Sequence, residues 1–121
     1  MEELIGRLVA NIGVDRTIAE KAVAIILQFL VQEGPPDKVK ALLDTLPGGQ
    51  AAVDAAPPDT GAGGLFGGGI MAAGSRMMAA GLSMGQVQAV ARETLAFARE
   101  KAGEDAVGEI VGAIPGLGQF V

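Results

Sequence analysis

Two aspartates, Asp37 and Asp105, come nearest in this sequence to the paired carboxylates of acid–base chemistry. They stand at equivalent places in two similar stretches of the chain. General acid–base catalysis needs two carboxyl groups that converge in a cleft. Each aspartate, however, stands where a helix is expected to begin, and capping and the helix dipole already explain a carboxylate there. We therefore expect no catalytic residues. Other acidic residues are expected on solvated faces: Glu2, Glu3, Glu20, Glu33 and Glu104.

The chain contains neither cysteine nor histidine. Without cysteine there is no thiol nucleophile and no disulfide framework. Without histidine, the usual general base and the commonest transition-metal ligand are both missing. We therefore expect a protein that is not an enzyme and has no cofactor and no metal site.

Four methionines, Met71, Met77, Met78 and Met84, could offer thioether sulfur to Cu(I). They form no tight Met-x-x-Met array and have no Cys or His beside them. Core filling is therefore the favoured interpretation. A methionine-rich face that adapts to a partner protein is also compatible with the pattern.

Residues 57–69 contain Pro57-Pro58 and a run of glycines. A phosphate-binding loop needs a preceding strand and a Lys-Ser or Lys-Thr pair after the last glycine, and both are missing. Because Pro-Pro breaks helices and glycine loses most entropy on ordering, we expect a linker here.

The stretch from residue 61 to residue 82 carries a single charge, Arg76. Its length would suit a membrane span, but a spanning helix contains more Leu, Ile, Val and Phe and less Gly. A linker followed by a core helix is the favoured interpretation, and shallow contact with a membrane surface is the alternative. The candidate apolar contact surface is Leu65, Phe66, Ile70, Met71, Met77 and Met78.

The charge pattern excludes two further classes of protein. The formal net charge is −5, the nine basic residues are scattered, and only four aromatic residues are present, so we expect no nucleic-acid binding. The chain begins with Met-Glu-Glu rather than with the basic residues of a secretory signal. We therefore expect a soluble, cytoplasmic bacterial protein.

A shift of 68 residues aligns the two halves of the chain without a gap, so that Leu27 falls on Leu95 and Phe29 on Phe97. The apolar phase is kept as well. One stripe at helical spacing consists of Val39, Leu42, Leu43 and Leu46, and its counterpart consists of Val107, Ile110, Val111 and Ile114. A proline follows each stripe, Pro47 in the first and Pro115 in the second, and is expected to end the helix.

Two further helices are expected before each of these stripes. The longer helix of the first half has a broad apolar stripe, and its solvent-facing side consists of Glu20, Ala24, Gln28 and Gln32. Asp15 or Thr17 can cap the start of this helix. The long one of the second half begins with a Ser83–Gln86 capping box, and its inward positions include Thr94. A shorter helix precedes each: Leu4 to Ile12, with Val9 in its stripe, and a weaker one from Ile70 to Met78, interrupted by Gly74 and Ser75.

The predicted fold is therefore all-α, with two tandem three-helix repeats packed into one small bundle. Repeat 1 spans residues 1–56 with a short extra helix at 50–56, the Gly/Pro-rich linker spans 57–69, and repeat 2 spans 70–121. A unit this small rarely stands alone, so the copies should pack together. The expected function is a helical interaction or structural module that binds a protein partner or itself as a homo-oligomer. Binding of a membrane surface or an apolar ligand is the alternative.

Four short motifs occur in order along the chain: Gly13-Val14-Asp15, Leu46-Pro47-Gly48, Gly81-Leu82-Ser83 and Leu95-Ala96-Phe97. Through these motifs the chain resembles a family of small bacterial all-helical proteins of unknown function, the VcgC/VcgE type. The resemblance implies an all-helical fold and no established activity or catalytic residues.

Overall fold

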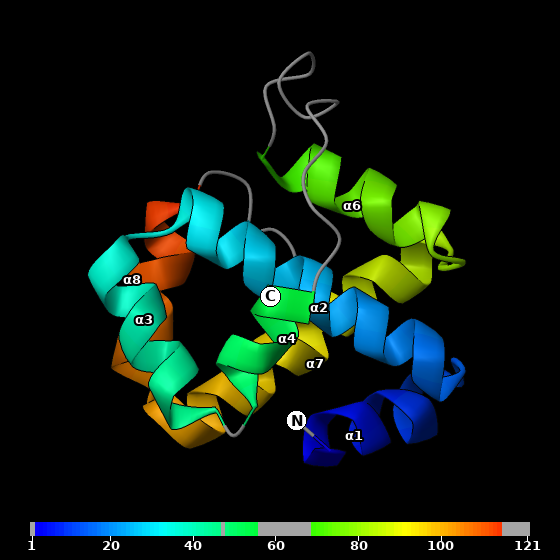
Figure 1. Cartoon of the computed structure of the whole chain (residues 1–121), viewed down its shortest axis with the longest axis horizontal. Coiled ribbons are helices and arrows are strands. Elements are labelled where there is room, and N and C mark those ends of the chain that lie inside the picture. The colour runs from blue at the N-terminus through cyan, green and yellow to red at the C-terminus, as the bar shows by residue number, and fades with distance from the viewer. Residues whose placement is uncertain (1, 47, 56–68, 115–121) are drawn as a thin grey trace.

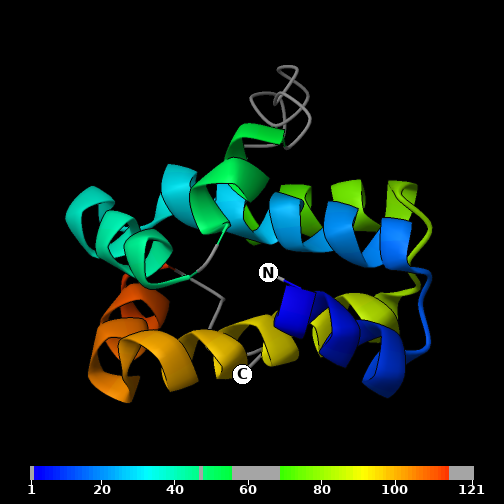
Figure 2. The ribbon, with the colours of Figure 1, turned by 60° about the horizontal axis from the view of Figure 1, so that its bottom comes forward.

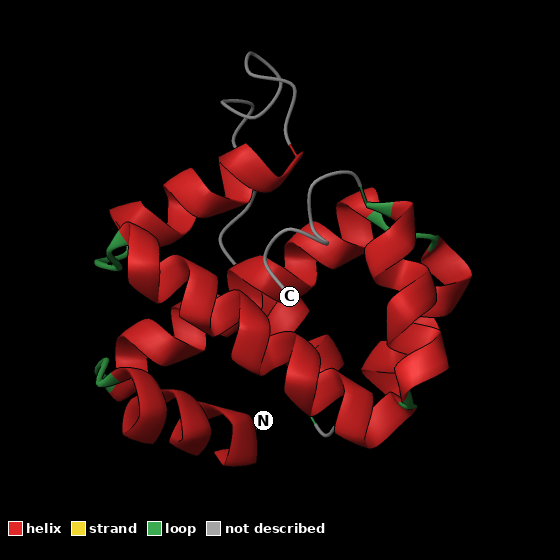
Figure 3. Cartoon of the chain, turned by 180° about the vertical axis from the view of Figure 1, so that it is seen from behind, coloured by secondary structure: helices red, strands yellow, loops and turns green. Residues whose placement is uncertain are grey.

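The computed structural model describes residues 2–46, 48–55 and 69–114, and within these it contains helices and short loops but no strand (Figure 3). This confirms the all-helical prediction for the described part of the chain. The helices are α1 (Glu2–Ile12), α2 (Arg16–Glu33), α3 (Pro36–Thr45), α4 (Gly49–Ala55), α6 (Gly69–Ala79), α7 (Met84–Ala102) and α8 (Glu104–Ala113). The expected linker at 57–69 falls outside the described residues except for Gly69, which begins α6.

The helices form two layers (Figures 1 and 2). Helices α2 and α6 pack side by side in one layer, and α1 and α7 pack side by side in the other. Contacts of α2 with α1 and α7, and of α6 with α7, hold the layers together. Helices α3 and α8 pack on each other at one end of the molecule. The short helix α4 lies on the outer side of α2 and also contacts α3.

The core lies between the two layers and is made of the apolar stripes that the sequence predicts. Long α2 and α7 contribute most of it because each is covered on more than one side, α2 by α1, α4 and α6 and α7 by α1, α3 and α8. Burying a large aliphatic or aromatic side chain stabilises the fold by about 1.5–3 kcal/mol before chain entropy is subtracted. The largest fully buried side chains are Phe97, Leu4, Leu8, Leu27, Leu30, Leu42, Leu95, Ile110, Val23, Val39, Val90 and Val107.

The start of α7 is fixed by the predicted capping box. The Ser83 hydroxyl accepts a hydrogen bond from the Gln86 backbone N–H at 3.2 Å, and the Gln86 side-chain oxygen accepts one from the Ser83 N–H at 2.9 Å. Asp15 is the N-cap residue of α2, as expected, but its side chain accepts no hydrogen bond from the helix. The N-terminus of α7 is therefore capped by side chains, whereas that of α2 has no side-chain cap.

Helix α6 corrects one detail of the sequence analysis. It runs through Gly74 and Ser75 without the expected interruption. Glycine costs a helix about 1 kcal/mol relative to alanine, which tertiary packing can outweigh. Here Ala73 and Met77 are buried in the core on either side of Gly74, and α6 packs along α2.

Two exposure predictions for α1 and α2 are wrong. Ala24, expected on the open face of α2, is only 6% exposed because α4 lies over that face, and the neighbouring Gln28 is half-buried. Val9, expected in the apolar stripe of α1, is 38% exposed. A stripe read from one helix does not reveal which additional face a later helix will cover.

Candidate functional site

The six residues of the predicted apolar contact surface do not form one described surface. Leu65 and Phe66 lie outside the described residues, and Ile70 and Met71 lie on α6 with side chains that are also outside the described part. Met77 is 4% exposed and belongs to the core, whereas Met78 is 45% exposed. Only Met78 therefore offers a described, solvent-accessible apolar side chain from this set.

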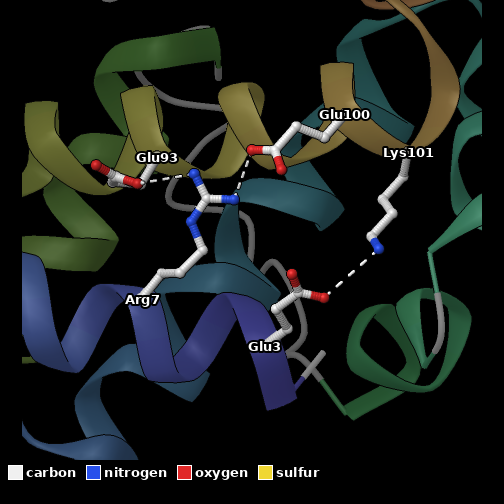
Figure 4. Close-up of polar contacts among 5 residues, drawn as sticks. All are labelled: Glu3, Arg7, Glu93, Glu100 and Lys101. Carbon is white, nitrogen blue, oxygen red and sulfur yellow. Dashed lines mark hydrogen bonds and ion pairs between the residues drawn. The ribbon is translucent and has the colours of Figure 1, made fainter.

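The best-defined polar site is an ion-pair cluster between α1 and α7, formed by Glu3, Arg7, Glu93, Glu100 and Lys101 (Figure 4). Arg7 reaches from α1 between two carboxylates of α7, with Nη1 2.7 Å from Glu100 Oε2 and Nη2 3.5 Å from Glu93 Oε2. Lys101 Nζ lies 3.5 Å from Glu3 Oε2 on α1. Each helix contributes at least one carboxylate and one cation, and each cation pairs with a carboxylate of the other helix. The pairs match because the two helices run antiparallel.

Phe97 lies beneath this cluster and is 1% exposed. The Arg7 guanidinium carbon is 5.7 Å from the centre of its ring, and Lys101 Nζ is 5.4 Å from the same point. Cations at such distances are attracted by the ring quadrupole. The two basic side chains therefore bind carboxylates at their tips and pack over a buried aromatic ring.

The electrostatics of the cluster stabilise its charged form. The hydrogen bond to Glu100 raises the pKa of Arg7, and the nearby charge of Glu93 acts in the same direction. A raised pKa keeps the guanidinium protonated at every physiological pH. Arg7 therefore carries a permanent positive charge between the two carboxylates of α7.

A second set of ion pairs lies on the rim of a groove between α1, α2 and α4. Arg16 binds Glu2 and also lies 3.4 Å from Glu20, and the hydrogen bond from Arg16 lowers the pKa of Glu2. The groove has a volume of about 290 Å³ and an apolar floor. Its lining is Glu2, Ile5, Glu20, Val23, Ala24, Gly48, Ala51 and Ala52. A general acid needs a raised carboxyl pKa, so the shift at Glu2 has the opposite direction from the one that catalysis would require.

A smaller groove of about 140 Å³ lies on the other side of α4. Its walls are Val31, Pro36, Val39, Lys40, Leu43, Gln50 and Val53. The two grooves flank a helix that contacts the core mainly through Ala52 and Val53. The described lining of the smaller groove includes no carboxylate, and the two carboxylates of the larger one both bind Arg16.

Asp37 and Asp105 occupy the first turns of α3 and α8 and are exposed. Neither helix has a side-chain hydrogen bond at its cap, so these aspartates act on the helix only through its dipole. Within the described residues, no group of three or more Asp, Glu, His or Cys side chains could hold a metal ion. Over the same residues, no helix is long and apolar enough to cross a membrane.

The chain matches no protein-family model, no curated protein and no solved structure. The resemblance to the VcgC/VcgE type therefore stays a prediction, and what the protein does has to be argued from its own side chains.

Sequence reasoning missed the α1–α7 ion-pair cluster. It placed Glu3 on a solvated face, and Glu3 is indeed exposed but is ion-paired with Lys101, as exposed Glu100 is with Arg7. The available signal was the spacing of charges, Glu3 and Arg7 four apart on one helix and Glu93 and Glu100 seven apart on another, which puts each pair on one face. The sequence does not reveal that these two faces meet.

Proposed function

We propose that this protein is a non-enzymatic helical interaction or structural module of the bacterial cytoplasm, built from two tandem three-helix repeats, and that it self-associates. The observation that carries the proposal is the correspondence of helix bounds at a shift of 68 residues. Helix α3 spans 36–45 and α8 spans 104–113, which differ by 68 at both ends. Helices α2 (16–33) and α7 (84–102), and α1 (2–12) and α6 (69–79), agree with that shift to within one residue.

Local backbone details support the same correspondence. Gly13 and Gly81, which precede the two long helices, both have positive φ, at 82° and 118°. Leu46 and Ile114 end α3 and α8 in the same way, each donating its N–H to the carbonyl three residues earlier, at 3.2 Å and 3.3 Å. Two small units that pack on one another within a chain can also pack between chains, and such an exchange is a low-cost route to a dimer.

The chemistry of the described side chains supports a binding or structural role over catalysis. The ion-paired carboxylates lie at or near the surface, and Arg16 lowers the pKa of Glu2, which holds that carboxyl group in its ionised form. Active sites instead tend to hold groups whose pKa values are moved toward neutral pH. We infer that the ion pairs of this molecule orient helices.

Light scattering over a concentration series, from dilute solution to about 1 mM, tests the self-association. The proposal expects the mean mass to rise toward that of a dimer as concentration increases. A mean mass equal to that of the monomer over the whole series would remove self-association from the proposal. A matched variant such as Glu33→Gln, at an exposed position on α2, should behave like the wild type.

The alternative function is contact with a membrane surface or an apolar ligand through the uncharged central segment. Its support in the structure is the exposure of Met78, at 45%, and of Met84, at 55%, on either side of the turn between α6 and α7. Co-sedimentation with neutral and anionic vesicles tests it, with the double variant Leu65→Ser/Phe66→Ser and, as a control, Val31→Ser at another exposed apolar site. Wild-type protein that stays in the supernatant with both vesicle types would exclude this alternative.

A further inference from the structure

We infer that this chain self-associates by exchanging halves between two copies. In the exchanged dimer, the first half of one chain (residues 2–55) packs on the second half of its partner (residues 69–114), through the contacts that join the halves within one chain. This inference rests on the proposed function and specifies the surface that carries it.

The packing that motivates the inference is reciprocal. Helix α1 of the first half packs against α7 of the second, and α6 of the second half packs against α2 of the first. Each layer of the molecule therefore contains one long and one short helix taken from different halves (Figure 2). The core between the layers belongs to both halves, so neither half can bury its apolar stripe without the other.

Close contacts at both ends of the molecule also join the halves. Near one end, a Cβ added at Gly81 would lie 3.2 Å from the Ile18 side chain. Near the other, a Cβ added at Gly34 would lie 3.5 Å from Ile114. The two halves thus approach each other closely near both ends of the molecule, and a second chain could supply the same contacts.

The charges on this surface are complementary as well. Ion pairs among the described residues connect the halves: Arg7–Glu93, Arg7–Glu100, Lys101–Glu3 and Lys38–Glu109, the last at 2.5 Å. Glu109 also raises the pKa of Lys38 by hydrogen bonding, which keeps the ammonium charged. Complementary charges of this kind favour the opposite half over partners that would bring like charges together.

Exchange retains all of these contacts and changes only which chain supplies them, which is why it is a low-cost route to a dimer. Because the two halves belong to one chain, each meets the other at an effective concentration of about 1 mM. The monomer, in which the halves of one chain pack on each other, should therefore dominate in dilute solution. The exchanged dimer should therefore accumulate as the protein concentration approaches that range, and most readily when the chain is refolded there.

The absence of cysteine from the sequence allows a direct test. Glu3→Cys in one preparation and Lys101→Cys in another place single thiols on α1 and α7 at two residues that form an ion pair. The two variants, one with a short tag, are unfolded together, refolded at high concentration and treated with a bismaleimide about as long as the two replaced side chains. Denaturing gels then separate mixed from like-with-like covalent dimers.

Exchange predicts that the mixed product, in which a Glu3→Cys chain is joined to a Lys101→Cys chain, exceeds either like-with-like product by about tenfold. The matched control replaces Lys101→Cys with Gln88→Cys, an exposed residue on the same helix about 20 Å away along its axis, and should give no such excess. The double variant Glu3→Cys/Lys101→Cys should cross-link within one chain in dilute solution. Failure of that internal cross-link would contradict the packing of α1 on α7 and overturn the inference.

The outcomes separate this inference from the proposed function. A dimer seen by light scattering without an excess of mixed product would mean association through an outer surface, which overturns exchange and leaves the proposed function intact. A strict monomer that also gives no mixed product would overturn exchange and remove self-association from the proposed function. A mixed product whose amount rises with the concentration at refolding would support both.

Discussion

Arg7 on α1 donates a hydrogen bond to Glu100 on α7 over 2.7 Å, between residues 93 positions apart in the sequence. The bond lies above Phe97, whose ring the Arg7 guanidinium also contacts. A single side chain thus ties α1 to α7 through one carboxylate and one aromatic face. This arrangement makes the strength of the link between the halves measurable.

A double-mutant cycle on Arg7→Gln and Glu100→Gln should give a coupling free energy of about 0.2–1 kcal/mol, because both side chains are partly solvated. The coupling should weaken in high salt, which screens exposed charges. Urea unfolding of the wild type, both single variants and the double variant measures it. A control cycle uses Arg92→Gln in place of Arg7→Gln, because exposed Arg92 forms no ion pair among the described residues; an equal coupling to Glu100 there would contradict a specific contact.

Phe97→Ala and Phe29→Ala should each lower the free energy of unfolding by about 3–5 kcal/mol, since both rings are buried and would leave cavities. Phe97 is 1% exposed and Phe29 is 5% exposed. Met84→Ala, at a position 55% exposed, should change stability by less than about 0.5 kcal/mol. A loss below about 1 kcal/mol at either phenylalanine would show that its ring is not part of the core.

The sequence predicts the individual helices of this protein better than it predicts which helices pack against one another. Periodicity locates Leu42 and Ile110 correctly in the core because one helix face is enough to specify burial. The capping box of Ser83 and Gln86 is equally local. The burial of Ala24, in contrast, depends on α4, which lies over α2 and is encoded elsewhere in the chain. The ion pairs between α1 and α7 escape prediction for the same reason.

Glycine substitutions should separate a tightly packed position, Gly34 at the C-cap of α2, from an open one inside a helix. A Cβ at Gly34 would lie 2.7 Å from the Leu30 carbonyl oxygen and 2.7 Å from Val39 Cγ2, so Gly34→Ala forces backbone or core to move and should destabilise by about 1–3 kcal/mol. At Gly108, inside α8, a Cβ meets nothing within 4 Å. Gly108→Ala should therefore stabilise by about 0.5–1 kcal/mol through helix propensity. Thermal unfolding of the two variants checks the contrast, and equal effects would refute it.

Acid should abolish the contribution of the Glu2–Arg16 ion pair to the free energy of unfolding. Arg16 lowers the pKa of Glu2 below its ordinary 4.5, so the pair's contribution is fully present above that value and is lost as pH falls through the lower folded-state pKa. Wild type should thus exceed Glu2→Gln slightly in stability at neutral pH, with the difference disappearing in acid. Urea unfolding across that range measures it. Gln32→Ala, at an exposed position on α2 that does not titrate, should show no such pH dependence.

The hydroxyl of Thr94 is the clearest unfavourable group in the core. Thr94 is 2% exposed, and its Oγ1 has no hydrogen-bond partner among the described residues. A buried polar group without a partner costs about 1–3 kcal/mol, whereas an apolar group of the same shape does not carry that cost. Thr94→Val keeps the β-branched shape and removes the hydroxyl. It should therefore raise the free energy of unfolding by about 1 kcal/mol.

Thr45 supplies the matched comparison, because its hydroxyl donates to the Leu42 carbonyl at 2.7 Å near the surface. Thr45→Val removes a hydrogen bond that is made, and it should lower stability by about 0.5–1.5 kcal/mol. The two Thr→Val changes should thus have opposite signs in the same urea titration. A loss of stability at Thr94 as large as that at Thr45 would mean that the Thr94 hydroxyl is hydrogen-bonded in solution, for example to the backbone of its own helix.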